Sequence, residues 1–244
     1  MSTFTSILWQ EYVLFKRKFW TITLAAMVSP ILYLIAFGWG IGGSVTVEGK
    51  SYINFIIPGI IALTTMTVSY NNTGNSINIS RIFYKTFEAF MMAPITVASY
   101  AIGKIVAGAL TGMYSALLII ILSLIAGTGI SISPYFILII ILNCLTFSAI
   151  GFTVGIFINS HTEMSKFSSF VITPMSFLCG TFFSLDKMPQ VIKIIIWMLP
   201  LTHTSLGLRN SGKDLMDMII HPIVLSIYFI LIFCIGVMKC KKAE

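Results

Sequence analysis

Long stretches without a charged side chain dominate this sequence and decide what it can fold into. Five runs are free of Asp, Glu, Lys and Arg: 19–47, 51–80, 105–160, 167–185 and 218–238. A helix crosses the roughly 30 Å hydrocarbon core of a bilayer with about 20 apolar residues. Charged residues are 9% of the chain and hydrophobic residues 57%, against about 25% charged in soluble domains. The chain is therefore predicted to cross a membrane several times, which excludes a soluble domain and a disordered chain.

The runs predict an all-α polytopic membrane protein with six transmembrane helices. The first helix is expected to end near Trp39, and the second near Tyr70, before a group of asparagines. The run 105–160 is too long for one span, and its Gly- and Ser-rich segment 127–134 predicts a turn. This run is therefore interpreted as two helices, at about 100–126 and 134–158. The fifth and sixth spans are predicted at 167–185 and 218–238.

A shorter apolar stretch before the last span cannot cross a membrane. Pro189 can begin a helix, because its missing N–H is not needed there, and Pro200 prevents simple continuation. We expect an outer loop, 184–217, that holds a re-entrant pair of short helices, whose apolar side chains would form a gate at the outer end of the bundle. Trp197 suits the water–lipid boundary, and Arg209 the level of the lipid headgroups. The residues predicted for this gate are Pro189, Trp197, Pro200, His203 and Arg209.

The N-terminal segment, 1–18, repeats apolar residues at helical spacing and ends in the basic triplet Lys16, Arg17 and Lys18. It is predicted to be an amphipathic helix in the membrane interface, and a frayed extension of the first span is the alternative. Further basic residues follow the last span and occupy the connections on the same side. Because Lys and Arg mark the cytoplasmic side, six spans place both termini in the cytoplasm of a cell-membrane protein.

The predicted cytoplasmic loop, 71–99, contains a second amphipathic pattern. Arg81, Lys85 and Glu88 are four and three positions apart, so they are expected to share one face of a helix that Pro94 ends. The other face carries large apolar side chains, at Phe83, Phe87, Phe90 and Met91. A surface helix stabilised only by its own ion pairs would not need them. We therefore expect a partner groove or the N-terminal helix to cover this face.

This loop resembles the corresponding loop of type-2 ATP-binding-cassette exporter permeases, often called type V exporters. In that family an Arg is followed by a Thr-x-Glu pattern, then a Pro, then a Gly-Lys that opens the next span. Here these are Arg81, Thr86-Phe-Glu88, Pro94 and Gly103-Lys104. The loop departs from the family where Ile82 replaces an acidic residue and Lys85 a glycine that many members carry.

A second match lies before the last span. The run Gly180–Pro189, followed by Leu199-Pro-Leu-Thr-His203 and Leu208-Arg209, is similar to the outer signature of the same family. The two motifs together look nearest to the branch that exports drugs and nodulation lipo-oligosaccharides.

The resemblance implies one permease domain, 1–244, that exports an amphiphilic or lipid-linked substrate: a drug, a lipo-oligosaccharide or a glycan. ATP would be hydrolysed by a separate ATPase subunit, which would bind the ATP and Mg²⁺, so no cofactor or metal is expected on this chain. The resemblance implies that the ATPase couples to Arg81, Lys85, Thr86, Glu88 and Pro94. A second copy or a similar subunit would complete the path, most simply as a homodimer, and membrane lipids are the remaining partner.

The residues themselves show no other source of energy and no catalytic constellation. The nearest approach to a phosphate-binding loop, Gly43–Ser51, is one residue too long and falls in a predicted outer loop. His161, His203 and His221 are expected at different levels of the bilayer, so few titratable side chains are available for a proton relay. The net charge of +7 is attributed to the basic cytoplasmic ends and not to nucleic-acid binding. An ion-coupled secondary carrier and a non-transport scaffold or immunity protein remain alternatives.

Small residues predict close helix packing within the spans. Gly108 and Gly112 form one G-x-x-x-G pair, and Gly151 and Gly155 form a second. Packing within the chain or at a subunit interface would each explain them. Asn143 lies within a span and is expected to need a polar partner there.

Overall fold

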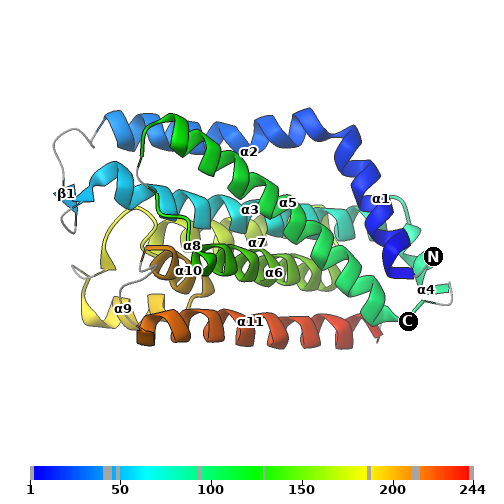
Figure 1. Ribbon diagram of the computed structural model, residues 1–244. Coiled ribbons are helices and arrows are strands. Elements are labelled where there is room, and N and C mark those ends of the chain that lie inside the picture. Colours follow the sequence, from blue (N-terminus) through cyan, green and yellow to red (C-terminus); the bar gives the residue numbers. More distant parts are fainter. Residues whose placement is uncertain are drawn as a thin grey trace.

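The computed structural model describes residues 3–40, 46–47, 50–92, 95–128, 130–185, 188–209 and 215–241. Its helices run side by side along one axis, and both ends of the chain lie at the same end of the bundle (Figure 1). That end, with α1 and α4, is called the terminal end below. The opposite end, with β1, α9 and α10, is called the hairpin end.

The first half of the chain forms helices and one antiparallel strand pair of two residues each: α1 (Thr3–Arg17), α2 (Phe19–Tyr33), the π-helical η1 (Leu34–Trp39), β1 (Thr46–Val47), β2 (Lys50–Ser51), α3 (Tyr52–Ile82), α4 (Thr86–Met92) and α5 (Val97–Ile125). The regular elements described in the second half are helices: α6 (Pro134–Phe157), α7 (His161–Phe167), the π-helical η2 (Ser168–Ile172), α8 (Thr173–Leu178), α9 (Gln190–Trp197), α10 (Pro200–Arg209) and α11 (Leu215–Lys241).

Within the described residues, five helices are long and apolar enough to span a bilayer: Phe19–Phe37, Tyr52–Ile82, Val97–Ile125, Pro134–Phe157 and Met218–Lys241. They coincide with five of the six predicted spans, so the polytopic helical fold is confirmed. The predicted turn between the third and fourth spans is also present. Gly127 there has φ +70°, and the Ser133 hydroxyl accepts a hydrogen bond from Phe136 N, which caps α6 at Pro134.

The prediction for the fifth span was wrong in its bounds. Instead of a helix over 167–185, the chain forms the consecutive α7, η2 and α8, from His161 to Leu178. The helix begins early because the Ser160 hydroxyl accepts from Thr162 N, and its first turns carry polar residues. Its π turn precedes Pro174, which cannot donate an intrahelical hydrogen bond. This segment falls outside the five long apolar helices, although it also runs along the bundle (Figure 1).

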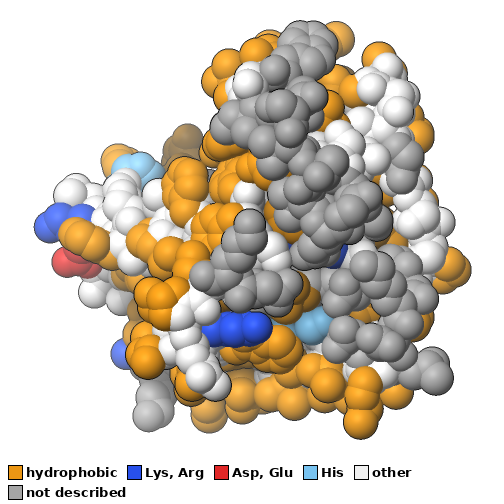
Figure 2. All heavy atoms as spheres, turned by 90° about the vertical axis from the view of Figure 1, so that its left-hand side faces the viewer, with side chains coloured by type: hydrophobic (Ala, Val, Ile, Leu, Met, Phe, Trp, Pro, Cys, Tyr) orange, Lys and Arg blue, Asp and Glu red, His pale blue; other side chains and the backbone are white. Residues whose placement is uncertain are grey.

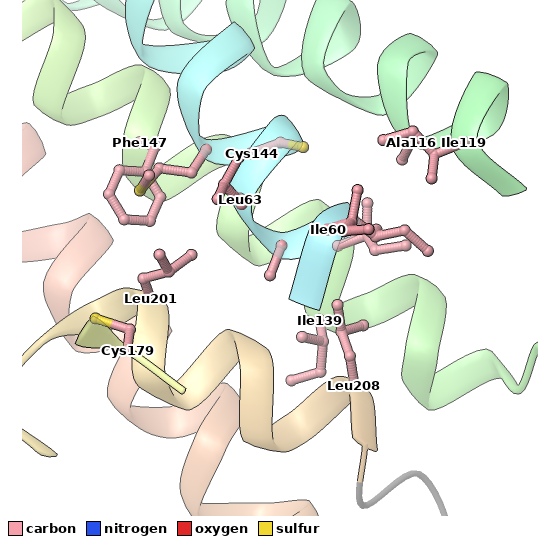
Figure 3. Close-up of a cluster of buried hydrophobic side chains, with 14 of the residues drawn as sticks. Ile60, Leu63, Ala116, Ile119, Ile139, Cys144, Phe147, Cys179, Leu201 and Leu208 are labelled. Atoms are coloured by element: carbon pink, nitrogen blue, oxygen red, sulfur yellow. The ribbon is translucent and has the colours of Figure 1, made fainter. Parts of the chain in front are cut away.

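Helix α3 is the centre of the bundle, with α5 and α6 packed against it. Its apolar positions meet α6 and α10 in the main core, where Ile60, Ile139, Phe147, Leu201 and Leu208 converge (Figure 3). By contrast, α2 and α11 are peripheral and expose rows of large apolar side chains, as expected of helices that face lipid.

Helix α3 also extends further than predicted. Its end was expected near Tyr70, but the helix continues to Ile82. Consequently, the first part of the predicted loop 71–99 belongs to α3, and its last residues begin α5. The asparagines that suggested a helix end instead lie on α3, where Asn72 donates to the Thr111 hydroxyl of α5 at 3.2 Å.

The expected re-entrant pair is present as α9 and α10. The two short helices meet at an angle of 96° at the break between Trp197 and Pro200. Pro189 precedes the first helical residue of α9, and Pro200 begins α10. Helix α9 is largely exposed, whereas α10 is buried against α3, α6 and α11.

Candidate functional site

Arg81 at the end of α3 caps another helix. Its Nη1 donates to the carbonyl oxygens of Gly155 and Ile156 at 2.9 and 2.6 Å, and its Nη2 donates to Asn159 Oδ1 at 3.2 Å. These carbonyls lie at the C-terminus of α6, which carries partial negative charge and lacks intrahelical donors. Arg81 therefore joins the terminal ends of α3 and α6, and this inward role could not be read from its spacing to other charges.

The predicted common face of Arg81, Lys85 and Glu88 does not form. The helix breaks after Ile82, and Lys85 adopts a left-handed conformation with φ +50°, where a glycine is more common. Helix α4 begins at Thr86, so Arg81 and Glu88 belong to two separate helices. Thr86, Lys85 and Glu88 are exposed, whereas Pro94 lies outside the described residues.

The apolar side of α4 is partly covered by the protein itself. Phe87 is buried, and its ring meets the Tyr100 ring of α5 at 5.8 Å, while the Phe90 ring lies 5.4 Å from the same tyrosine. Ile7 of α1 belongs to the same cluster, as the alternative of coverage by the N-terminal helix predicted. Phe83 and Tyr84 stay exposed beside α4, which leaves an apolar surface at the terminal end.

Helix α1 is fastened to the bundle by an ion pair. Glu11 binds Lys104 Nζ of α5, and both side chains are nearly buried, at 11% and 4% exposure. The Ser76 hydroxyl of α3 lies 3.4 Å from the same carboxylate oxygen and 3.3 Å from Lys104 Nζ. Ile7, one turn earlier, packs against Gly103, where a Cβ would come within 2.8 Å of it. The sequence indicated Lys104 only as part of the Gly-Lys pair that opens a span, and the need of a buried charge for a partner was the only clue to this ion pair.

A cavity of about 1230 Å³ lies between α1, α2, α3 and α5 and extends to α8. One wall carries polar α3 side chains at helical spacing, among them Thr64, Thr67, Asn71 and Asn75. The α2 wall is mostly apolar and includes Ile22, Ala25, Ala26 and Pro30. Glu11 and Lys104 line the cavity as well, so the ion pair contributes to its lining.

The four predicted packing glycines all face helices of the same chain. A Cβ on Gly108 would lie 1.8 Å from Thr73 Oγ1, and one on Gly112 would lie 1.9 Å from Ser69 Oγ. A Cβ on Gly151 would lie 2.5 Å from the Tyr70 carbonyl oxygen, and one on Gly155 would lie 3.0 Å from that of Gly74. Because they have no side chain, these glycines let α5 and α6 pack closely against α3.

The polar partners expected for Asn143 are present. Its Nδ2 donates to the Ala62 carbonyl oxygen at 3.2 Å and to Thr65 Oγ1 at 2.9 Å. Its Oδ1 accepts from Thr204 Oγ1 at 2.7 Å. This fully buried side chain therefore ties α3, α6 and α10 together within the bundle.

The hairpin end contains a pair of buried histidines. His203 Nδ1 lies 3.2 Å from His221 Nδ1, and His203 Nε2 lies 2.9 Å from the Trp197 carbonyl oxygen. The expectation that the histidines occupy different levels was therefore wrong for this pair, because α10 folds back beside the start of α11. The Trp197 ring stands edge-on to His203 at 5.5 Å. The Tyr228 hydroxyl of α11 donates to the Met198 carbonyl oxygen, a second link between α11 and the hairpin.

Arg209 at the end of α10 is partly buried and turns back onto the protein. Its Nε donates to the Phe55 carbonyl oxygen at 3.2 Å and its Nη2 to that of Thr181 at 2.9 Å. The guanidinium also stacks on the Phe55 ring at 3.8 Å. Figure 2 views this end of the bundle and shows hydrophobic side chains over much of the described surface, with few basic ones between them.

Comparison with known proteins decides the family. A family model described as ABC-2 type transporter matches residues 2–211. This chain belongs to the ABC-2 type transporter family. It is 26% identical over 232 residues to the inner membrane transport permease YadH of Escherichia coli K12, covering 94% of this chain and 89% of the relative. It is 27% identical over 248 residues to nodulation protein J of Rhizobium leguminosarum bv. viciae, covering 96% and 92%.

Membership confirms three predictions. The chain is the membrane-spanning permease subunit of an ABC transporter, and it is not itself the ATPase. It resides in the membrane, as its long apolar helices require. As an ABC permease, it works with an ABC ATPase subunit.

Proposed function

We propose that this permease exports an amphiphilic or lipid-linked compound, with a drug, a lipo-oligosaccharide or a glycan as the candidate classes. The cavity carries this proposal, because it opposes a polar wall of α3 to an apolar wall of α2. An amphiphile can place its headgroup on the first wall and its chain on the second. At about 1230 Å³, the cavity also exceeds the roughly 300–1,000 Å³ of common small-molecule pockets.

A flipping assay tests this proposal. The permease and its ATPase are reconstituted in liposomes with a short-chain fluorescent glycolipid, and ATP-driven movement between leaflets is followed by chemical quenching. We expect ATP-dependent movement, and a slower rate in Asn75→Leu, because its carboxamide lines the polar wall. Ser226→Ala is the control, since that hydroxyl lies on α11 away from the cavity and donates to the Pro222 carbonyl oxygen of its own helix at 2.8 Å. Absence of ATP-dependent movement for glycolipid and for fluorescent amphiphilic drugs alike would contradict an exporter of amphiphiles.

The ATPase is proposed to dock at the terminal end, against α4 and the residues around it. Glu88, Lys85 and Thr86 are exposed there, and Phe83 and Tyr84 add uncovered apolar surface. Arg81 supports this surface from beneath, because it lies 5.8 Å from the centre of the Phe87 ring. Glu88→Lys should uncouple ATP hydrolysis from transport while membrane insertion stays normal. Normal transport and normal ATPase stimulation in this variant would contradict docking at α4.

The terminal end is proposed to face the cytoplasm, where the ATPase and its ATP are found. Most described basic residues lie at this end, in the segments around Lys16, Lys85, Lys166 and Lys239, whereas Lys50, Lys193 and Arg209 lie at the hairpin end. An excess of basic residues marks the cytoplasmic side. The hairpin end would then face outwards. A second copy of this chain, or a similar subunit, is proposed to complete the export path, since isologous pairs are the commonest assembly.

The α9–α10 hairpin is proposed to gate the outer end of the path. Helix α10 occupies the hairpin end between α3, α6 and α11, and Arg209 and His203 hold it there through the contacts given above. Trp197 lies at the bend between Pro189 and Pro200, where the exposed α9 meets the buried α10. Thiol probes along 190–208 should be protected on the α10 side in the resting state. Free accessibility throughout this segment would make it an ordinary surface loop.

A further inference from the structure

The contacts of Tyr100 connect α4, where the ATPase is proposed to dock, with α1, which lines the cavity. Tyr100 is fully buried in α5, with Phe87 and Phe90 of α4 on one side. One helical turn later, Lys104 places its Nζ 5.9 Å from the centre of the Tyr100 ring and binds Glu11 of α1. An unbroken chain of buried contacts therefore runs from α4 to α1.

Helix α1 forms part of the wall of the cavity at its terminal end. Its residues Leu8, Glu11, Tyr12 and Phe15 line the cavity, together with Ser76 and Ile79 of α3. Helix α1 meets α2 at Lys18, whose φ of −104° and ψ of 14° interrupt the helix. The chain changes direction at this residue (Figure 1). Beyond this elbow, Ile7 in its contact with Gly103 and the Glu11–Lys104 pair fasten α1 to α5.

The strength of this fastening comes from its burial. A buried ion pair contributes little net stability, but removal of one partner leaves an uncompensated charge in a poorly solvated place. Lys104 is 4% exposed, so little of its side chain is open to water while α1 is in place. Packed interiors change between discrete arrangements and do not deform continuously. A displacement of Phe87 and Phe90 must therefore either leave a void beside Tyr100 or move the α5 turn that carries Lys104.

We propose that Tyr100, Lys104 and Glu11 are positioning residues that link α4 to α1, so that movement of α4 opens or closes the terminal end of the cavity. This inference rests on the proposed docking of the ATPase at α4. The ion pair between Glu11 and Lys104 holds α1 against α5, and the Tyr100 ring transmits a displacement of α4 to the turn of α5 that carries Lys104. No residue of the link needs to contact cargo or nucleotide.

A cysteine at Ile79 can report the state of the cavity. The four native cysteines are replaced, and the permease with its ATPase is studied in inside-out vesicles with a water-soluble maleimide. Labelling is compared without nucleotide and with ATP plus vanadate. In the parent protein we expect a nucleotide-dependent change of about fivefold or more, the lower range for coupling between two sites. Glu11→Gln should label at the faster rate in both states, because the wall is no longer fastened.

Two further variants separate the link from simple damage. The exchange Glu11→Lys with Lys104→Glu restores an ion pair, so the nucleotide response should return. Tyr100→Leu should label at one rate in both states while the ATPase still co-purifies, because the ring contacts to α4 are lost. Tyr100→Phe is the matched control and should respond like the parent, since it keeps the ring that contacts Phe87 and Phe90.

The outcomes distinguish this inference from the proposed function. If the parent protein binds no ATPase or shows no response to nucleotide, docking at α4 fails and the link fails with it. If the parent responds and Tyr100→Leu responds equally, the link is refuted while docking stands. A nucleotide response of Glu11→Gln equal to that of the parent would likewise refute the role of the ion pair.

Discussion

Replacement of Asn143 by Leu should destabilise the permease by about 2 kcal/mol. The side chain makes three hydrogen bonds, to Ala62, Thr65 and Thr204, and is 0% exposed. Hydrogen bonds between helices in a membrane average about 0.6 kcal/mol each, with a maximum near 1.7. The loss should stay near the sum of three average bonds, because the partners keep other acceptors: Thr65 Oγ1 also donates to the Ile61 carbonyl oxygen at 2.6 Å, and Thr204 Oγ1 to that of Pro200 at 3.4 Å.

The assay is equilibrium unfolding of the purified permease in mixed micelles with increasing SDS. Thr204→Val, alone and combined with Asn143→Leu, gives a double-mutant cycle in which the coupling free energy should be about 0.6–1.7 kcal/mol. Asn72→Leu is the control, since that carboxamide makes one side-chain hydrogen bond, to Thr111, and should cost about 0.6 kcal/mol. A loss below about 0.5 kcal/mol for Asn143→Leu, or additive single variants, would refute the role of this network.

Three further predictions follow from contacts at the two ends and the centre of the bundle. Gly151→Ala should lower the free energy of unfolding by about 1–3 kcal/mol, because its Cβ would press on the α3 backbone. Gly207→Ala should lower it less, since only the Ile139 and Tyr135 side chains must yield. Equal losses in the two variants would contradict close backbone packing at Gly151. Arg81→Leu should lower the free energy of unfolding by about 1–2 kcal/mol, because the C-terminus of α6 loses its cap, and Arg81→Lys should have an intermediate effect. No loss of stability in the same unfolding assay would contradict the capping role. In intact cells, a cysteine at Val191 should react with an impermeant maleimide and one at Glu88 should not; the reverse pattern would invert the orientation.

Sequence alone predicted the spans well because each depends on a one-dimensional property. A run of apolar residues either is or is not long enough to cross the bilayer, whatever its neighbours are. The segment from His161 to Leu178 was misplaced because its first turns are polar and its start depends on the Ser160 cap. The end of α3 was misplaced because asparagines look like a helix stop until a partner such as Thr111 is known.

The candidate site was less predictable, because it depends on tertiary contacts. The spacing of Arg81, Lys85 and Glu88 implies a shared face only if the helix is continuous, and the left-handed Lys85 breaks it. His203 and His221 are 18 positions apart and meet only because α10 returns to α11. Glu11 and Lys104 pair across 93 positions, and no local pattern joins them. Asn143 was the exception, since a buried carboxamide in a span demands a partner whichever residue supplies it.

The ABC ATPase is proposed to dock on α4 at the terminal end of this permease. A photo-crosslinking amino acid at Glu88, which is exposed on α4, tests this proposal most directly, with the same probe at the exposed Val191 of α9 as control. After irradiation in native membranes, the cross-linked product is identified by mass spectrometry. The docking proposal predicts capture of an ABC ATPase subunit from Glu88 and not from Val191. Capture of the ATPase from Val191, or from neither position while the complex still co-purifies, would contradict it.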